Sequence, residues 1–106
     1  ISADMHKELK IAVIEKNQRV GKKLLTTGNG RCNLTNIYAD KSNYHGSFSH
    51  FADNTLKLCS PQKVLDLFLD MGLVTRADDF GRVYPKSNQA SSVLDVLRFN
   101  CERKNV

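Results

Sequence analysis

The sequence predicts an α/β fold, on three observations. A continuous apolar run over residues 11–14 ends in an acid, which is typical of a parallel strand covered on both faces. An amphipathic helix with its own start and stop signals follows in the middle of the chain, and a second one closes it. The chain has 106 residues, of which 41% are hydrophobic and 25% charged, so it fits one small globular unit at most.

The first half of the chain supplies the strand and a long loop region. Residues 3–9 carry helix formers without Gly or Pro and predict the tail of a helix that leads into the strand. Residues 16–36 are basic and small polar, with three glycines, and are interpreted as a loop. Residues 37–49 are interpreted as a surface loop, and residues 51–58 predict a short helix.

The second half carries clearer signals. Ser60 and Pro61 have the residue types of an N-cap and a first helical position, and they start a helix that ends at Gly72. Residues 73–76 and 81–84 predict a small hairpin around a polar turn, which Pro85 closes. The last helix runs from about Ser87 to Arg103. Apolar faces of the two helices consist of Val64, Leu65, Phe68 and Leu69, and of Ala90, Val93, Leu94, Leu97 and Cys101.

Composition narrows the class of protein. No apolar run approaches the roughly 18 to 20 residues that cross a bilayer, so we expect no membrane partner. The 3 cysteines are widely spaced without a CxxC pair, which predicts neither disulfides nor a zinc knuckle and suits the cytoplasm. A net charge of +5 favours anionic partners.

The chain opens at Ile1 without an initiator and closes at Val106 where a new strand would begin, so we expect an internal piece of a larger protein.

Glu15 is the first candidate site residue. In a dinucleotide-binding βαβ unit, an acid at the end of the second strand accepts hydrogen bonds from the adenosine ribose, about 20 residues beyond a glycine-rich turn. Since 14 residues precede Glu15, that turn would lie upstream of Ile1. The alternative is an acid that merely caps a strand at the surface. The residues alone leave both interpretations open.

The segment from Thr26 to Asn33 is the second candidate. Gly28 and Gly30 let a backbone approach an anion closely and point its N–H groups at it. Positive charge would come from Lys22, Lys23 and Arg31. The segment is not a Walker loop, and Asn33 stands where GxGxxG would have its third glycine. The alternative is a Gly-Asn-Gly turn with solvated basic residues, which these residues do not exclude.

The remaining cysteine, histidine and aspartate residues do not predict a catalytic or metal site. A neighbouring guanidinium would lower the pKa of the Cys32 thiol, but most single cysteines are small buried hydrophobes, so packing is preferred. His45 and His50 lack carboxylate or thiol companions, so no metal site is assigned. Asp78 and Asp79 have the spacing of turn residues rather than of catalytic carboxylates.

Three segments, at residues 11–17, 20–25 and 27–36, together resemble a known family. They are similar to the bacterial FAD-dependent oxidoreductases of the BaiN-like (HI-0933-like) flavoprotein group, for which Gly-x-Gly-Arg-Cys-Asn-x-Thr-Asn is highly specific. The resemblance continues through residues 81–85 and Ser87. It implies that residues 1–106 are part of a Rossmann-like FAD-binding domain: the second strand, the cofactor loop, a helical excursion with a small hairpin, and the following helix, without the first strand and the glycine-rich turn.

The resemblance also implies roles for single residues. Glu15 would hold the adenosine ribose of FAD with Lys16 beside it, and Gly21, Lys22 and Lys23 would border the cofactor channel. The pyrophosphate and flavin side would be lined by Thr27, Gly28, Gly30, Arg31, Cys32 and Asn33. Family members are associated with reducing activated C=C bonds, with NAD(P)H as the donor, on substrates from steroid enones to a uridine of ribosomal RNA. The resemblance leaves the catalytic residues outside these positions.

Two further expectations concern the isolated chain and its alternatives. Without the glycine-rich turn, the piece should bind FAD poorly or not at all and be inactive alone. Without the first strand, residues 11–14 would have an unpaired edge, so the piece should be marginally stable or self-associate. A different class is a basic nucleic-acid-binding module that uses Lys22, Lys23 and Arg31, although it lacks a recognised groove-reading helix. A helical interaction domain that uses the face from Val64 to Leu69 is a third possibility.

Overall fold

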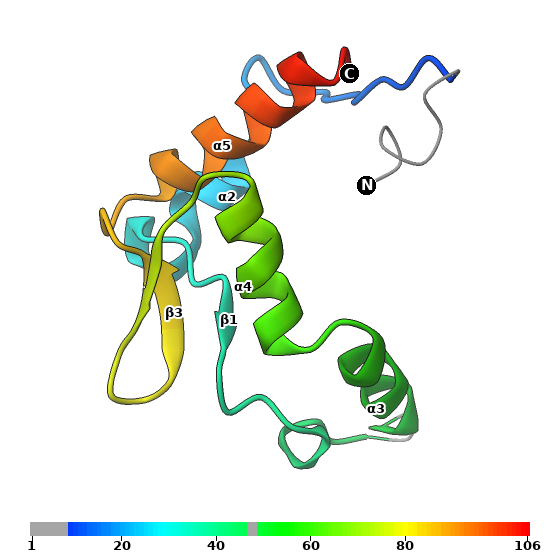
Figure 1. Cartoon of the computed structure of the whole chain (residues 1–106), viewed down its shortest axis with the longest axis vertical. Coiled ribbons are helices and arrows are strands. Elements are labelled where there is room, and N and C mark those ends of the chain that lie inside the picture. Colours follow the sequence, from blue (N-terminus) through cyan, green and yellow to red (C-terminus); the bar gives the residue numbers. More distant parts are fainter. Residues whose placement is uncertain (1–8, 47–48) are drawn as a thin grey trace.

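The computed structural model describes residues 9–46 and 49–106, and Figure 1 shows their arrangement. In chain order the elements are α2 (Lys22–Thr26), the 3₁₀ turn η1 (Thr27–Gly30), β1 (Thr35–Asn36), the 3₁₀ turn η2 (Lys41–Asn43), α3 (Ser49–Leu58), α4 (Pro61–Asp70), β2 (Thr75–Ala77), β3 (Arg82–Pro85) and α5 (Ala90–Arg103). The chain is thus α/β, as predicted, and none of these helices has the length and apolar character needed to span a membrane.

The sheet is small and antiparallel, with strand order β1-β3-β2. β2 and β3 form the predicted hairpin, in which Arg76 lies opposite Tyr84. β1 adds to the other side of β3, with Thr35 opposite Val83. The sequence did not predict β1, because a strand of two polar residues has no apolar alternation and forms only on the backbone of β3.

The core lies between the sheet and α5. Cys32, Leu73, Ala90 and Val93 are buried together, and partly buried apolar residues surround them: Leu24, Leu34, Phe68, Val96 and Leu97. The predicted inner face of α5 is therefore confirmed at Ala90, Val93 and Leu97, whereas Leu94 and Cys101 line a groove beside the core. α2 lies beside α5 in Figure 1, and a Cβ added to Gly21 would lie 2.5 Å from Leu94 Cδ1. This close approach explains why glycine precedes α2.

The central helices begin and end at their sequence signals, but the predicted apolar face of α4 is only partly confirmed, since Phe68 packs against the core and Leu69 is 60% exposed. Ser60 caps α4, since its Oγ accepts a hydrogen bond from Lys63 N at 3.3 Å. α4 ends where Gly72 takes a left-handed φ of +94° and the Leu73 N–H donates to Phe68 O at 2.8 Å. α3 confirms the helix predicted over residues 51–58. The loop predicted over residues 37–49 contains η2, which Asp40 caps through Ser42 N at 2.9 Å.

Two expectations for the first part of the chain need correction. Residues 11–15 form no strand, because no segment among the described residues pairs with them, and Val13 and Ile14 are 70% and 95% exposed. The predicted loop over residues 16–36 is wrong in part, since it contains α2, η1 and β1. The helix tail predicted over residues 3–9 falls, except for Leu9, outside the described residues.

Candidate anion-binding site

The glycine turn, residues 27–33, has a backbone of unusual handedness. The Arg31 N–H donates to Gly28 O at 3.2 Å and the Cys32 N–H to Thr27 O at 3.0 Å, which closes the turn. Positive φ angles occur at Gly28 (+55°), Asn29 (+56°), Gly30 (+79°) and Cys32 (+59°). Gly and Asn adopt this region most readily, so the sequence Gly-Asn-Gly is what permits the shape.

The two glycines of this turn face different surroundings. A Cβ on Gly28 would lie 2.7 Å from Asn33 N and 3.4 Å from Tyr84 Cε1, so this glycine allows the turn to fold against itself. A Cβ on Gly30 would meet no atom within 4 Å. Gly30 therefore lies on the open side of the turn, where a ligand has access to the backbone.

Arg31 is held by two contacts. Its Nε donates to Gly28 O at 3.3 Å, and its guanidinium carbon lies 4.4 Å from the centroid of the Tyr84 ring. Its terminal nitrogens, Nη1 and Nη2, donate to no acceptor among residues 9–46 and 49–106. The charged end of Arg31 is thus positioned by the protein and has donors left for an anion.

Asn33 and Cys32 fasten the turn to the rest of the fold. With its amide oriented by the hydrogen-bond pattern, Asn33 Nδ2 donates to Val83 O at 3.2 Å and to Thr35 O at 2.8 Å. The Asn33 backbone N–H donates to no acceptor within the described ranges. The Cys32 side chain is 6% exposed and packs in the core. The packing interpretation of Cys32 is therefore confirmed, and its backbone N–H is engaged by Thr27 O.

Glu15 lies at the surface on the extended segment before α2. Its Oε1 accepts hydrogen bonds from Asn17 N at 2.8 Å and from Asn17 Nδ2 at 2.6 Å. The backbone hydrogen bond from Asn17, followed by the side-chain one, lowers the pKa of Glu15. Oε2 accepts no hydrogen bond from the described part of the chain, so an ionised carboxylate keeps one oxygen free for a hydroxyl group.

A basic hollow of about 560 Å³ lies between this segment and α2. Its lining brings together two predicted site residues, Lys16 and Lys22, and adds Arg19, which sequence reasoning did not single out. The other lining residues are Asn17, Gln18 and Leu25. Lys23 belongs to α2 but does not line this hollow. The structure thus gathers positive charge next to Glu15.

Some predicted site residues have structural contacts instead. The Thr27 hydroxyl donates to Leu24 O at 2.7 Å, so it secures the end of α2. Gly21 lies against Leu94. Among the residues that the structure describes, no hydrogen bond or ion pair joins Glu15 to the glycine turn. The site therefore has two separate parts, the carboxylate with its basic hollow and the glycine turn with Arg31.

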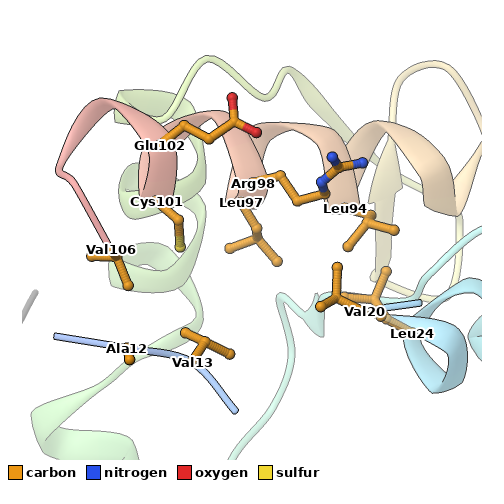
Figure 2. A pocket seen from close by; sticks show the side chains of 11 residues that line it. Ala12, Val13, Val20, Leu24, Leu94, Leu97, Arg98, Cys101, Glu102 and Val106 are labelled. Atoms are coloured by element: carbon orange, nitrogen blue, oxygen red, sulfur yellow. The ribbon is translucent and has the colours of Figure 1, made fainter. Parts of the chain in front are cut away.

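An apolar groove of about 460 Å³ lies between α2, α5 and the extended segment (Figure 2). Figure 2 shows aliphatic side chains from both sides facing it, with Arg98 and Glu102 projecting from α5. The lining residues are Ala12, Val13, Val20, Gly21, Leu24, Leu94, Leu97, Arg98, Cys101, Glu102 and Val106. The described part of the chain holds no group of three His, Cys, Asp or Glu side chains that could bind a metal ion. Charge-based anion binding and apolar burial therefore occur in different places.

The two polar parts suit one kind of ligand. Arg31 Nη1 and Nη2 and the Asn33 N–H supply donors for a phosphate, and Glu15 Oε2 supplies an acceptor for a hydroxyl. A nucleotide carries both groups in one molecule. The arrangement therefore fits a phosphate-bearing nucleotide better than a metal ion or a neutral apolar ligand.

Comparison with known proteins adds independent observations. The model of a family described as HI0933-like protein Rossmann domain matches residues 1–106. A 3-dehydro-bile acid delta(4,6)-reductase of Clostridium scindens is 42% identical over 99 residues, which cover 93% of this chain and 24% of the relative. A ribosomal RNA dihydrouridine synthase of Escherichia coli is 28% identical over 97 residues, which cover 92% of this chain and 24% of the relative.

A ribosomal RNA dihydrouridine synthase of Haemophilus influenzae is 22% identical over 93 residues, which cover 88% of this chain and 23% of the relative. The chain therefore spans about a quarter of the length of the curated relatives it matches.

Proposed function

This chain belongs to the HI0933-like Rossmann domain family, and we propose that residues 1–106 form part of the FAD-binding domain of a flavin-dependent oxidoreductase. The observation that carries the proposal is the glycine turn with Arg31, whose free donors suit the pyrophosphate of FAD. The carboxylate of Glu15, with one oxygen free, suits a ribose hydroxyl.

The proposal assigns each part of the site a task. Arg31 and the Asn33 N–H bind the pyrophosphate, and the open side of the turn at Gly30 admits it without a side-chain clash. Glu15 orients the adenosine end. Lys16, Arg19 and Lys22 offset the negative charge of the cofactor around the basic hollow. FAD, when bound, supplies the hydride chemistry, and these residues supply its position and electrostatic environment.

We propose further that the reaction is the reduction of an activated C=C bond, with NAD(P)H as the electron donor. The names of the relatives support the reduction of a C=C bond, because one is a delta(4,6)-reductase of a bile acid and the others are ribosomal RNA dihydrouridine synthases, while the NAD(P)H donor rests on the resemblance of the sequence to the family. The substrate of the present protein would accordingly be a small unsaturated molecule or an RNA base. The cytoplasm, where nicotinamide donors and RNA are present, is the proposed location.

The test is the flavin content of the protein encoded by the complete reading frame that contains this sequence. We expect the purified protein to show flavin absorbance, or to take up added FAD, and Arg31→Ala to weaken FAD binding about tenfold or more, as expected for a charge-assisted contact. Lys57→Ala, on α3 and paired with Asp53, serves as a matched loss of positive charge and should leave binding unchanged. A colourless protein that takes up no FAD would contradict the proposal.

The alternative proposal, a nucleic-acid-binding module, uses the same positive charge. Of the residues predicted for it, Lys22, Lys23 and Arg31, only Lys22 lines the basic hollow. Lys16 and Arg19 line the same hollow, and this grouping of positive charge is what favours the alternative. It predicts that the present chain binds RNA at low salt, with an affinity that falls steeply as salt rises. Absence of RNA binding at low salt would remove this alternative and leave FAD binding unaffected.

A further inference from the structure

We infer that Tyr84 is a positioning residue that holds the Arg31 guanidinium ready for the cofactor pyrophosphate. The inference rests on the proposed function, since it names how one contact to FAD is prepared. Tyr84 belongs to β3, whereas Arg31 ends the glycine turn, so the contact joins two segments that are far apart in the sequence.

The contact has the geometry of a cation–π interaction. The guanidinium carbon lies 4.4 Å from the ring centroid, well within the distance of about 6 Å at which the ring face attracts a cation. The Tyr84 side chain is 3% exposed, so neighbouring atoms fix the ring in place. Burial also removes water that would screen the attraction, and such contacts are stronger when they are desolvated.

The same ring supports the turn itself. A Cβ on Gly28 would lie 3.4 Å from Tyr84 Cε1, so the backbone of the turn lies directly against the ring. Arg31 Nε meanwhile donates to Gly28 O at 3.3 Å. The guanidinium is therefore bounded by the ring and by the Gly28 carbonyl, and these contacts leave its terminal nitrogens for the anion.

Positioning matters because an arginine side chain that is already ordered loses less rotamer freedom when it binds. Without the ring, Arg31 would keep its charge but sample more conformations. Loss of Tyr84 should therefore weaken a ligand that contacts the guanidinium. It should leave unchanged a ligand that lacks the phosphates.

The test compares FAD with riboflavin, which lacks the pyrophosphate, on the protein of the complete reading frame. We expect Tyr84→Phe to bind FAD within about twofold of wild type, because the ring face is kept, and Tyr84→Leu to bind it about tenfold more weakly. Riboflavin affinity should not change in either variant. In an Arg31→Ala background, Tyr84→Leu should cause no further loss of FAD affinity. A merely structural role would weaken both ligands and would do so in both backgrounds.

A second series guards against misfolding of Tyr84→Leu, whose side chain fills the buried ring position less well. Phenylalanines with increasing fluorine content at position 84 keep the ring size and withdraw electron density from its face. We expect FAD affinity to fall stepwise along this series. Equal affinity throughout would overturn the role of Tyr84 while leaving FAD binding established. Failure of the wild-type protein to bind FAD would instead overturn the proposed function and the role of Tyr84 together.

Discussion

At the scale of single residues, the shape of the glycine turn depends on residues that tolerate a left-handed backbone. Gly28 and Gly30 both have positive φ, but only Gly28 lies where a Cβ would approach another atom closely, at 2.7 Å from Asn33 N. An alanine at Gly30 would therefore introduce backbone strain alone, whereas an alanine at Gly28 would introduce the same strain and a steric clash. Comparing the two substitutions separates these two effects on stability.

We predict that Gly30→Ala lowers the free energy of unfolding by about 1 kcal/mol, the usual cost of a left-handed non-glycine residue. Gly28→Ala should lower it by about 2 to 3 kcal/mol, because the clash adds to the strain. Urea unfolding of the two variants measures the difference. Equal losses would show that the turn rearranges freely around Gly28.

Part of the candidate site could be predicted from residue types alone. Gly28, Gly30 and Asn33 could be selected because their conformational freedom and polarity are local properties. The partner of Arg31 could not be predicted, since Tyr84 meets it only after β3 has formed. Asn17 was also missed, because nothing in the sequence shows that Glu15 Oε1 folds back onto it.

At the scale of elements, α4 shows how a local signal fixes a boundary. Ser60 Oγ accepts the Lys63 N–H at 3.3 Å, and Pro61 occupies the first turn. We predict that Ser60→Ala lowers the free energy of unfolding by about 1 kcal/mol, whereas Ser60→Asp, which keeps a capping oxygen, leaves it nearly unchanged. Thermal unfolding of both variants checks this. Equal destabilisation by Ala and Asp would mean that the cap contributes nothing.

The β2–β3 hairpin gives a prediction on pH. Partial desolvation raises the pKa of Asp78, but hydrogen bonds from the Arg82 side chain and backbone and from Phe80 N outweigh it, so the pKa is lowered. A carboxylate with a depressed folded-state pKa stabilises the fold above its unfolded pKa, and this contribution is lost as pH falls through the folded value.

We therefore expect Asp78→Asn to destabilise the chain near neutral pH and to reduce the loss of stability as pH falls below about 4. Asp79→Asn, at the exposed neighbouring position, should change neither. Urea unfolding at a series of pH values provides the measurement. If the free energy of unfolding falls equally steeply with decreasing pH in Asp78→Asn and in wild type, the Asp78 carboxylate does not contribute to the acid sensitivity.

Elements differ in how far the sequence determines them. α4, α5 and the hairpin carry start signals, turns or apolar periods within their own residues, and all three formed. Their bounds differ in detail, since α5 begins at Ala90 rather than near Ser87, and Pro85, expected to follow the hairpin, is paired within β3. A strand also needs a hydrogen-bonded neighbour, so residues 11–14 had a correct strand composition and yet form none here. α2 was missed because a helix of five residues is formed by packing against α5 rather than by propensity.

At the scale of the whole molecule, the chain exposes more surface than a self-contained domain. Its accessible surface is 8296 Å², whereas a folded monomer of 11.9 kDa has roughly 5,900 Å². The radius of gyration is 15.3 Å, against about 13 Å for a compact chain of this length. Part of the excess lies at Val13, Ile14 and the apolar groove, which suit burial against further structure.

We predict that the 106-residue chain self-associates when it is produced alone, because the exposed apolar segment at residues 11–14 has no partner within the described residues and can pair as a strand with a second copy. Ile14→Lys should reduce association measured by sedimentation equilibrium. Leu58→Lys removes an apolar side chain that is 78% exposed, at the end of α3, and should not reduce association. A monomeric wild-type chain with a cooperative unfolding transition would contradict the prediction.

The central claim is that the glycine turn and Glu15 together hold the adenine dinucleotide of FAD. The most direct measurement is an experimental structure of the protein from the complete reading frame with FAD bound. We predict that pyrophosphate oxygens lie about 2.7 to 3.2 Å from Arg31 Nη atoms and the Asn33 N, and that a ribose hydroxyl lies at that distance from Glu15 Oε2. A pyrophosphate bound elsewhere, with the turn and Glu15 both facing solvent, would contradict the account.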